Sequence, residues 1–142
     1  MDRIEDCVSF LLAKAYQQVN GAAKRRLLQH GVTPVQYAVL KVMWEHHAQS
    51  GAAIGERLQL DSATITGVLD RLTNAGLLER QADAVDRRVN RIVLTTQGRA
   101  LQSPLDREMD ALNADVFGQF PLADADRLRA MLAHMGNVEV SA

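Results

Sequence analysis

Arginine is concentrated in one stretch of this 142-residue chain, between residues 71 and 99. This stretch contains six arginines and three acidic residues. The arginines are Arg71, Arg80, Arg87, Arg88, Arg91 and Arg99. Guanidinium groups bind phosphate oxygens and base edges, so one interpretation is a nucleic-acid partner and the other is a solvated charged surface. The net charge of −1 conceals the cluster, because residues 100–142 carry three basic and seven acidic side chains.

Short hydroxyl side chains precede these arginines at Ser62, Thr64 and Thr66. They fall on the polar face of a predicted helix, whose apolar residues recur at helical spacing. Those apolar residues are Ile65, Val68, Leu69 and Leu72. Either Asp61 or Ser62 is expected to cap this helix. Because serine and threonine are short, such a helix can approach DNA closely and bond to bases or phosphates.

The elements that would position these side chains are mostly helical. The apolar spacing predicts helices over residues 4–30, 34–47, 52–60 and 62–74, strands over residues 77–81 and 89–95, a long helix from Thr96 and a last helix after Pro121. Thr33, Pro34 and Gln36 predict a capping box for the second helix. Pro104 is expected to kink the long helix, because proline removes one backbone hydrogen bond.

The first and last helices also carry wide apolar stripes. In the first helix they include Ile4, Val8, Leu11, Leu12, Ala15, Val19, Ala22 and Leu27. In the last helix they are Leu128, Met131, Leu132 and Met135, which are expected to point inward. A chain of this length with apolar helices at both ends is expected to gain much of its core from a partner.

This order of elements predicts a fold that is mainly α with a small β-hairpin wing. Two short helices, a tight turn and a hairpin with a basic tip make a winged helix-turn-helix. In such a module the second helix lies in the major groove of DNA. The basic loop reaches an adjacent minor groove, where narrow A·T-rich segments attract arginine.

Several motifs of the chain, in the same order, closely resemble the MarR family (multiple-antibiotic-resistance regulators). The motifs are Val32–Tyr37, Leu58–Thr66, Leu69–Leu72, Gly76–Arg80, Asp86–Arg88 and Leu94–Gly98. The resemblance covers residues 8–136 and is strongest over residues 33–101. It implies a homodimer in which residues 1–32 and 100–142 form an intertwined helical dimerisation region. Residues 33–99 would then form the winged helix-turn-helix that binds a pseudo-palindromic operator in double-stranded DNA.

The resemblance also implies roles for single residues. Ser62, Thr64 and Thr66 would face the major groove. Arg88 at the wing tip would enter the minor groove and Arg87 would contact a phosphate. Asp86 would orient Arg88 and pair with Arg71, although a purely scaffolding ion pair is the alternative for Arg71 and Asp86. Many family members carry arginine just before this aspartate, and here the residue is Val85.

Family members are commonly repressors that a small aromatic or phenolic acid releases from DNA. The resemblance therefore implies an aromatic effector. Candidate lining residues are Phe10, Tyr16, Arg25, Tyr37, Trp44 and His46. Aromatic side chains would line a pocket and the basic groups would bind a carboxylate. Packing in the core is the alternative role for the aromatic residues.

Oxidation of a cysteine and binding of zinc are the two alternatives to an organic effector. Cys7 is the single cysteine, and oxidation of it would release DNA in a redox-responsive regulator. Its position is two residues away from the reactive cysteine of the peroxide-sensing relatives, so a buried structural thiol is expected. Zinc would need ligands near His46 and His47, but adjacent helical residues diverge by about 100°. We therefore expect neither a metal site nor another cofactor.

Other classes of protein are disfavoured by the sequence. Nothing in it resembles a catalytic site, so an enzyme is not expected. No run of about 18 apolar residues predicts a membrane span, and the acidic start does not resemble a secretory signal. A cytoplasmic protein is expected, since one cysteine cannot form an internal disulfide. The rival to a DNA-binding regulator is an interaction module that uses the same fold without DNA.

Overall fold

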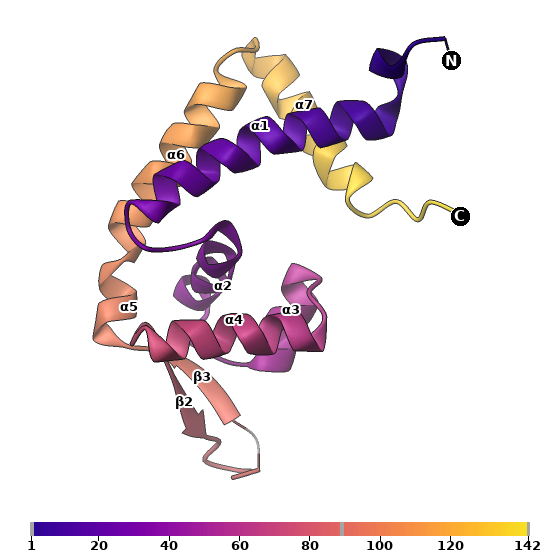
Figure 1. The fold of residues 1–142 in the computed structure, drawn as a ribbon. Helices are drawn as coiled ribbons and strands as arrows, with labels where there is room; N and C mark the ends of the chain where they lie inside the picture. Colours follow the sequence, from indigo (N-terminus) through magenta and orange to yellow (C-terminus); the bar gives the residue numbers. More distant parts are fainter. Residues whose placement is uncertain (1, 89, 142) are drawn as a thin grey trace.

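The fold of the computed structural model divides into a helical upper part and a lower part that ends in a hairpin (Figure 1). The structure describes residues 2–88 and 90–141. In the upper part α1 (Val8–Leu28) packs along α6 (Gln102–Phe117), and α7 (Leu122–Met135) follows α6 and crosses behind α1. A short 3₁₀ helix, Ile4–Asp6, precedes α1. We call residues 33–99, which form the lower part, the winged module.

The winged module has the predicted helices and hairpin in the predicted order, with one additional strand. They are α2 (Pro34–Glu45), β1 (Ala48–Ser50), α3 (Gly51–Leu58), α4 (Ser62–Asn74), β2 (Leu78–Ala82), β3 (Asn90–Leu94) and, at its end, the start of α5 (Thr96–Ala100). The predicted hairpin is confirmed, although its first strand lies one residue further along and its second is shorter than predicted. Val89, the first residue of the predicted second strand, lies outside the described residues.

Side-chain caps mark the starts of four helices in this module. The capping box predicted at Thr33 and Gln36 is present, with Pro34 at the first helical position. Asp61 caps α4, and Ser50 and Thr95 cap α3 and α5 in the same way. Each cap accepts a hydrogen bond from a backbone N–H that has no partner inside its helix.

A short strand that the sequence did not predict completes the sheet. β1 pairs with β3, and β2 pairs with β3 on the other side, so the antiparallel order is β1-β3-β2. Ala48 lies opposite Val93, and Ser50 lies opposite Arg91. A strand of three residues is too short to show an alternating pattern, which explains why it was missed.

The prediction of one long helix from Thr96 kinked at Pro104 was wrong. Two helices, α5 and α6, meet at Leu101, and Pro104 lies in the first turn of α6. Within a continuous helix the proline ring would clash with the carbonyl of Ala100 and leave that carbonyl without its hydrogen bond. In a first turn the missing N–H has no cost, because it would have no helical partner.

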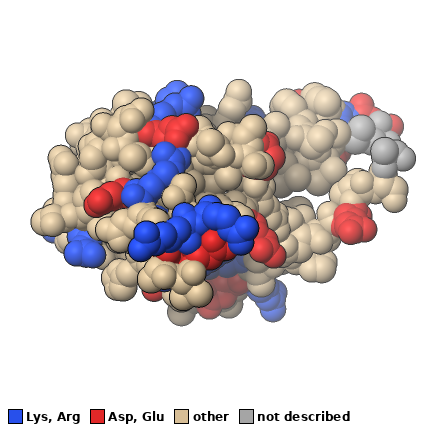
Figure 2. All heavy atoms as spheres, turned by 90° about the horizontal axis from the view of Figure 1, so that it is seen from below, with Lys and Arg blue, Asp and Glu red and all other residues tan. Residues whose placement is uncertain are grey.

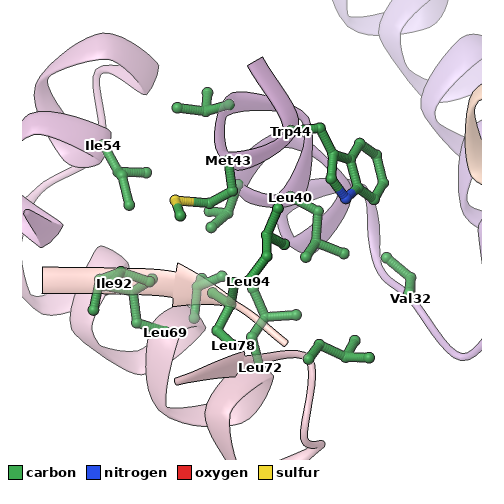
Figure 3. Packing of buried hydrophobic residues seen from close by; sticks show 14 of the residues in the cluster. Val32, Leu40, Met43, Trp44, Ile54, Leu69, Leu72, Leu78, Ile92 and Leu94 are labelled. Carbon is green, nitrogen blue, oxygen red and sulfur yellow. The ribbon is translucent and has the colours of Figure 1, made fainter. Parts of the chain in front are cut away.

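One hydrophobic core holds the winged module together. Figure 3 shows side chains from α2, α3, α4 and the strands that meet in it. Its fully buried members include Leu40, Met43, Ile54, Leu72 and Leu78. Val32 extends the core toward α1, and Leu105 extends it toward α6.

The apolar stripes of the terminal helices lie largely on the surface of the single chain. In α1 only Ala23 and Leu27 are buried, and in α7 only Ala125 is buried. Leu11 is 50% exposed and Met131 is 56% exposed. Met131, Leu132 and Met135, which were predicted to point inward, are therefore not buried within the single chain, whereas the terminal helices were also expected to gain much of their core from a partner. No helix in the described part of the chain combines the length and apolar character needed to span a bilayer.

Candidate nucleic-acid interface

α4 presents the hydroxyl side chains on its exposed face, as the sequence predicts. Ser62, Thr64 and Thr66 are exposed, and the buried residues Ile65 and Leu69 anchor the helix from the opposite side. Asp61 fixes its N-terminus, because its Oδ1 accepts a hydrogen bond of 2.7 Å from the backbone N–H of Thr64. That hydrogen bond lowers the pKa of the Asp61 carboxyl.

The wing between β2 and β3 is folded by two acidic side chains. Oδ1 of Asp83 accepts from the backbone N–H of Val85 at 2.8 Å and from that of Asp86 at 3.2 Å. These backbone bonds, together with nearby Arg91, lower the pKa of Asp83. Asp86 accepts from both the backbone and the side chain of Arg88. The loop therefore has a defined shape set by its own sequence.

The predicted orientation of Arg88 by Asp86 is present in the structure. Nε of Arg88 donates to Oδ1 of Asp86 at 3.1 Å, and Nη2 donates to Oδ2 at 3.3 Å. The bond from the Arg88 side chain is the main reason why the pKa of Asp86 is low. The Arg88 side chain remains 91% exposed, so its outer face is available to a partner.

The predicted pair of Arg71 with Asp86 does not occur in the described structure. Instead, the residue before Arg71 joins α4 to the wing. Nη2 of Arg80 on β2 donates to Oδ1 of Asp70 at 2.6 Å. Successive helical residues point about 100° apart, so Asp70 and Arg71 cannot both face β2. The link was missed because no periodic pattern relates a helix residue to a strand residue ten positions away.

Acidic partners reduce the positive charge of this face. Figure 2 shows basic side chains in a row across the underside of the molecule, with acidic side chains beside them. Arg80, Arg88 and Arg91 pair with Asp70, Asp86 and Asp83. Among the described residues, the other three arginines of the cluster have no ion-pair partner. They are Arg71, Arg87 and Arg99.

Two of the candidate effector residues have structural roles between helices. Trp44 is buried, and its Nε1 donates to the carbonyl oxygen of Gly98 at 3.0 Å. Tyr37 packs edge-on against Trp44 and donates its hydroxyl to Oδ1 of Asp106 at 3.0 Å. Partial burial, with a smaller contribution from Asp106, raises the pKa of Tyr37. Trp44 therefore holds α2 against α5, and Tyr37 holds α2 against α6.

The other four effector candidates lie in different surroundings. Tyr16 and Arg25 are exposed on α1, Phe10 is half-buried there, and His46 is exposed at the C-terminal end of α2. A hollow of about 300 Å³ between α1 and α6 is lined by residues other than these six candidates. They include Val19, Ala22, Arg26, Leu112, Val116 and Phe120. Arg26 forms an ion pair with Asp115 at its rim.

Cys7 lies at the start of α1 and is partly exposed, so the expectation of a buried thiol was wrong for the single chain. Its Sγ lies 3.2 Å from Oγ of Ser9, and this hydrogen bond lowers the pKa of the thiol. Over residues 2–88 and 90–141 we find no group of three metal-ligating side chains.

Gly98 joins several elements at one buried point. A Cβ atom there would lie 2.1 Å from the carbonyl oxygen of Leu77. Its own backbone N–H donates to Oγ1 of Thr95 at 3.0 Å, and its carbonyl accepts the indole bond of Trp44. Only a residue without a side chain fits between α5, the start of β2 and α2.

Known proteins with this arrangement are transcriptional regulators. The chain matches the model of the MarR family over residues 32–89. It is 40% identical to the HTH-type transcriptional regulator TtmR of Methylorubrum extorquens over 119 residues, which are 83% of this chain and 58% of TtmR. The match therefore covers less than two thirds of that regulator's length.

Solved structures match over almost the whole chain. A probable transcriptional regulator from Pseudomonas aeruginosa is 30% identical, with a TM-score of 0.87 over 94% of this chain and 99% of that one. BpsR from Bordetella bronchiseptica, whose DNA binding is regulated by 6-hydroxynicotinic acid, is 26% identical. Its TM-score is 0.90, over 98% of this chain and 99% of BpsR. The order of elements, the winged module and these similarities together show that the chain belongs to the MarR family.

Proposed function

We propose that the protein is a transcription regulator that binds operator DNA as a homodimer and acts as a repressor. The observation that carries the proposal is the link between α4 and β2 of the wing, which are joined by the ion pair of Asp70 and Arg80. A helix with exposed hydroxyl groups beside a wing with exposed arginines fits the two grooves of one duplex segment. Membership of a family of regulators supports the same function.

Within this proposal the side chains divide into two groups. Ser62, Thr64 and Thr66 contact the major groove from the exposed face of α4. Arg88 enters the minor groove and Arg87 binds a phosphate beside it. The unpaired Arg71 lies at the other end of α4, where it can reach a phosphate of the same site.

The proposed homodimer follows from the exposed apolar surfaces of α1 and α7. Leu11, Leu12, Met131 and Leu132 are each more than 40% exposed in the single chain. A second copy would bury these stripes against its own and place two winged modules on one operator. The two recognition helices would then lie about one turn of DNA apart, so the operator would be pseudo-palindromic.

The proposed effector is a small aromatic or phenolic acid that releases the operator. The regulation of DNA binding in BpsR by 6-hydroxynicotinic acid supports this class of ligand. The place on this chain that fits its chemistry is the apolar hollow beside Arg26. The predicted candidates Phe10 and Arg25 are about 22 Å apart along α1, so they cannot contact one small ligand together.

A titration with selected DNA tests the proposed function. The wild-type protein would first select its site from a random duplex library, and affinity would then be measured by fluorescence anisotropy at several salt concentrations. Arg88→Ala should weaken specific binding by about 1–3 kcal/mol and lower the salt slope by about one. Arg107→Ala, which removes an exposed arginine from α6, is the control and should bind normally.

Two results would contradict this assignment. Failure of the wild-type protein to select any sequence at low salt would favour an interaction module that does not bind DNA. Equal affinities of wild type and Arg88→Ala would remove the wing from the interface. A thermal-shift screen of aromatic acids tests the effector, because a ligand of the native state raises the melting temperature. Loss of that shift in Arg26→Ala but not in Arg25→Ala would support the hollow, and the reverse result would support a contact through Arg25 instead.

A further inference from the structure

Gly67 lies in the interior of α4, the helix that is proposed to enter the major groove. It is flanked by helical residues on both sides within α4, which spans 13 residues from Ser62 to Asn74. Glycine destabilises a helix interior relative to alanine, because it gains no side-chain contacts and loses more backbone freedom on folding. A glycine at such a position therefore needs a reason.

The structure of the single chain does not provide that reason. A Cβ atom built on Gly67 would meet no atom within 4 Å. Its backbone does not have the positive φ angle found at Gly31 and Gly76. By contrast, a Cβ atom at Gly98 would collide with the carbonyl of Leu77, and one at Gly55 would lie 3.3 Å from the carbonyl of Leu60. Alanine would fit at Gly67 and would favour the helix.

Gly67 also lies on the side of α4 that faces away from the core. Its neighbour Thr66 is exposed, as are Ala63 one turn before it and Asp70 one turn after it. Ile65 and Val68 on either side turn into the core. The open space at Gly67 is therefore on the face that carries the proposed DNA contacts.

We propose that Gly67 is the point where DNA comes closest to the backbone of α4. The inference rests on the proposed function and adds to it a residue that determines specificity. Glycine is favoured wherever a backbone must approach a ligand closely, since any side chain would act as a spacer. The absent side chain sets how deeply α4 enters the major groove. This depth determines whether the short hydroxyl groups of Ser62 and Thr66 reach base edges.

The substitution Gly67→Ala separates this role from a structural one. The variant should melt at the same temperature as wild type or higher, because alanine favours the helix. Its affinity for the duplex selected by the wild-type protein should fall at least tenfold. Gly67→Leu should bind more weakly still, because its side chain is a longer spacer. Affinity for random duplex at low salt should change little, since it depends on phosphate contacts.

Gly21→Ala provides a matched control. Gly21 is also in a helix interior, in α1 away from α4 (Figure 1). The nearest atom to a Cβ atom there is the flexible Nη1 of Arg25 at 3.5 Å. This variant should gain similar helix stability and bind the selected duplex with wild-type affinity.

Each other outcome has a distinct meaning. Wild-type affinity in Gly67→Ala, with Arg88→Ala still weakened, would overturn the role of Gly67 and leave the proposed function intact. A lower melting temperature in Gly67→Ala would show that the glycine serves packing within the protein, and would also overturn the inference. If wild type selects no duplex, the proposed function itself fails.

Discussion

At the scale of the residue, single polar side chains determine where α4 starts and how the wing is shaped. Asp61 holds the first turn of α4, and Asp83 and Asp86 fold the loop between the strands. In each case a carboxylate accepts backbone hydrogen bonds, which favours the charged form and lowers its pKa. The geometry of the proposed interface therefore depends on ionised acids.

Asp61 predicts a pH dependence of stability. Its pKa is lower in the folded chain, so its contribution is present above the unfolded value of about 3.9 and is lost as pH falls through the folded pKa. Asp61→Asn keeps a capping oxygen but removes the charge, whereas Asp61→Ala removes the cap. Thermal melts at neutral pH should rank wild type above Asp61→Asn and Asp61→Asn above Asp61→Ala.

The same melts at low pH complete the test. Below about pH 4 the advantage of wild type over Asp61→Asn should shrink, because protonation removes the charge of Asp61 and leaves both side chains neutral. A difference that stays constant between pH 7 and pH 3 would contradict the assignment of the charge to the cap.

Short-range contacts of this kind were predictable, and long-range pairs were not. Thr33 and Gln36 signal their capping box by their spacing, and the bond between Asp86 and Arg88 joins residues two apart. The pair of Asp70 with Arg80 depends on how a helix packs on a strand, which composition and spacing do not encode. Asp86 bonds to Arg88, two residues away, and not to Arg71, its other predicted partner, which lies on α4.

At the scale of the element, α6 connects the upper helices to the winged module through its acidic side chains. Asp106 accepts from the Tyr37 hydroxyl at 3.0 Å and from Nζ of Lys41 at 2.9 Å, both on α2. Further along α6, Asp115 pairs with Arg26 of α1. A change in the angle between α1 and α6 would therefore reach α2 through this helix.

Asp106→Ala should loosen the contact between α2 and α6. The substitution leaves the part-buried Tyr37 hydroxyl and Lys41 without their acceptor, which should lower the free energy of unfolding by about 1–3 kcal/mol. Asp110→Ala, an exposed position one turn further along α6, is the control and should change stability little. Urea unfolding measures both, and equal stabilities of the two variants would contradict this role of Asp106.

The types and order of the elements were predictable because each carries a long periodic pattern or a clear cap. The exceptions have local causes. β1 is too short to show a period, and the break between α5 and α6 depends on where Pro104 falls within its helix. A proline indicates that a continuous helix is disturbed, but packing decides whether the helix bends or is divided.

At the scale of the whole molecule, the helices near the two ends of the chain carry apolar side chains that the core of the single chain does not bury. α7 has one buried residue, Ala125, and the stripe around Leu132 faces outward. The sequence identified these stripes by their spacing, but spacing does not distinguish a chain's own core from a partner's surface. Their direction becomes clear only when the single chain is folded.

Leu132→Glu should dissociate the proposed dimer. Burial of a leucine contributes about 1.5–3 kcal/mol, so its replacement by a charged side chain should raise the dimer dissociation constant at least about tenfold. Sedimentation velocity over a range of concentrations measures this change. Val85→Glu, at a 97% exposed position on the wing, is the matched control and should assemble like wild type. An unchanged dimer in Leu132→Glu would exclude this stripe from the interface.

The junction at Gly98 has a consequence for the evolution of this protein. Arg87 of the wing and the hydroxyl groups of α4 are exposed and make no ion pair among the described residues, so a lineage could exchange them, and with them the proposed operator, without disturbing the fold. The position occupied by Gly98 offers no such freedom, because the Leu77 carbonyl excludes even a methyl group. We therefore expect homologous sequences to diverge in what they recognise while glycine persists at the junction that aims the wing.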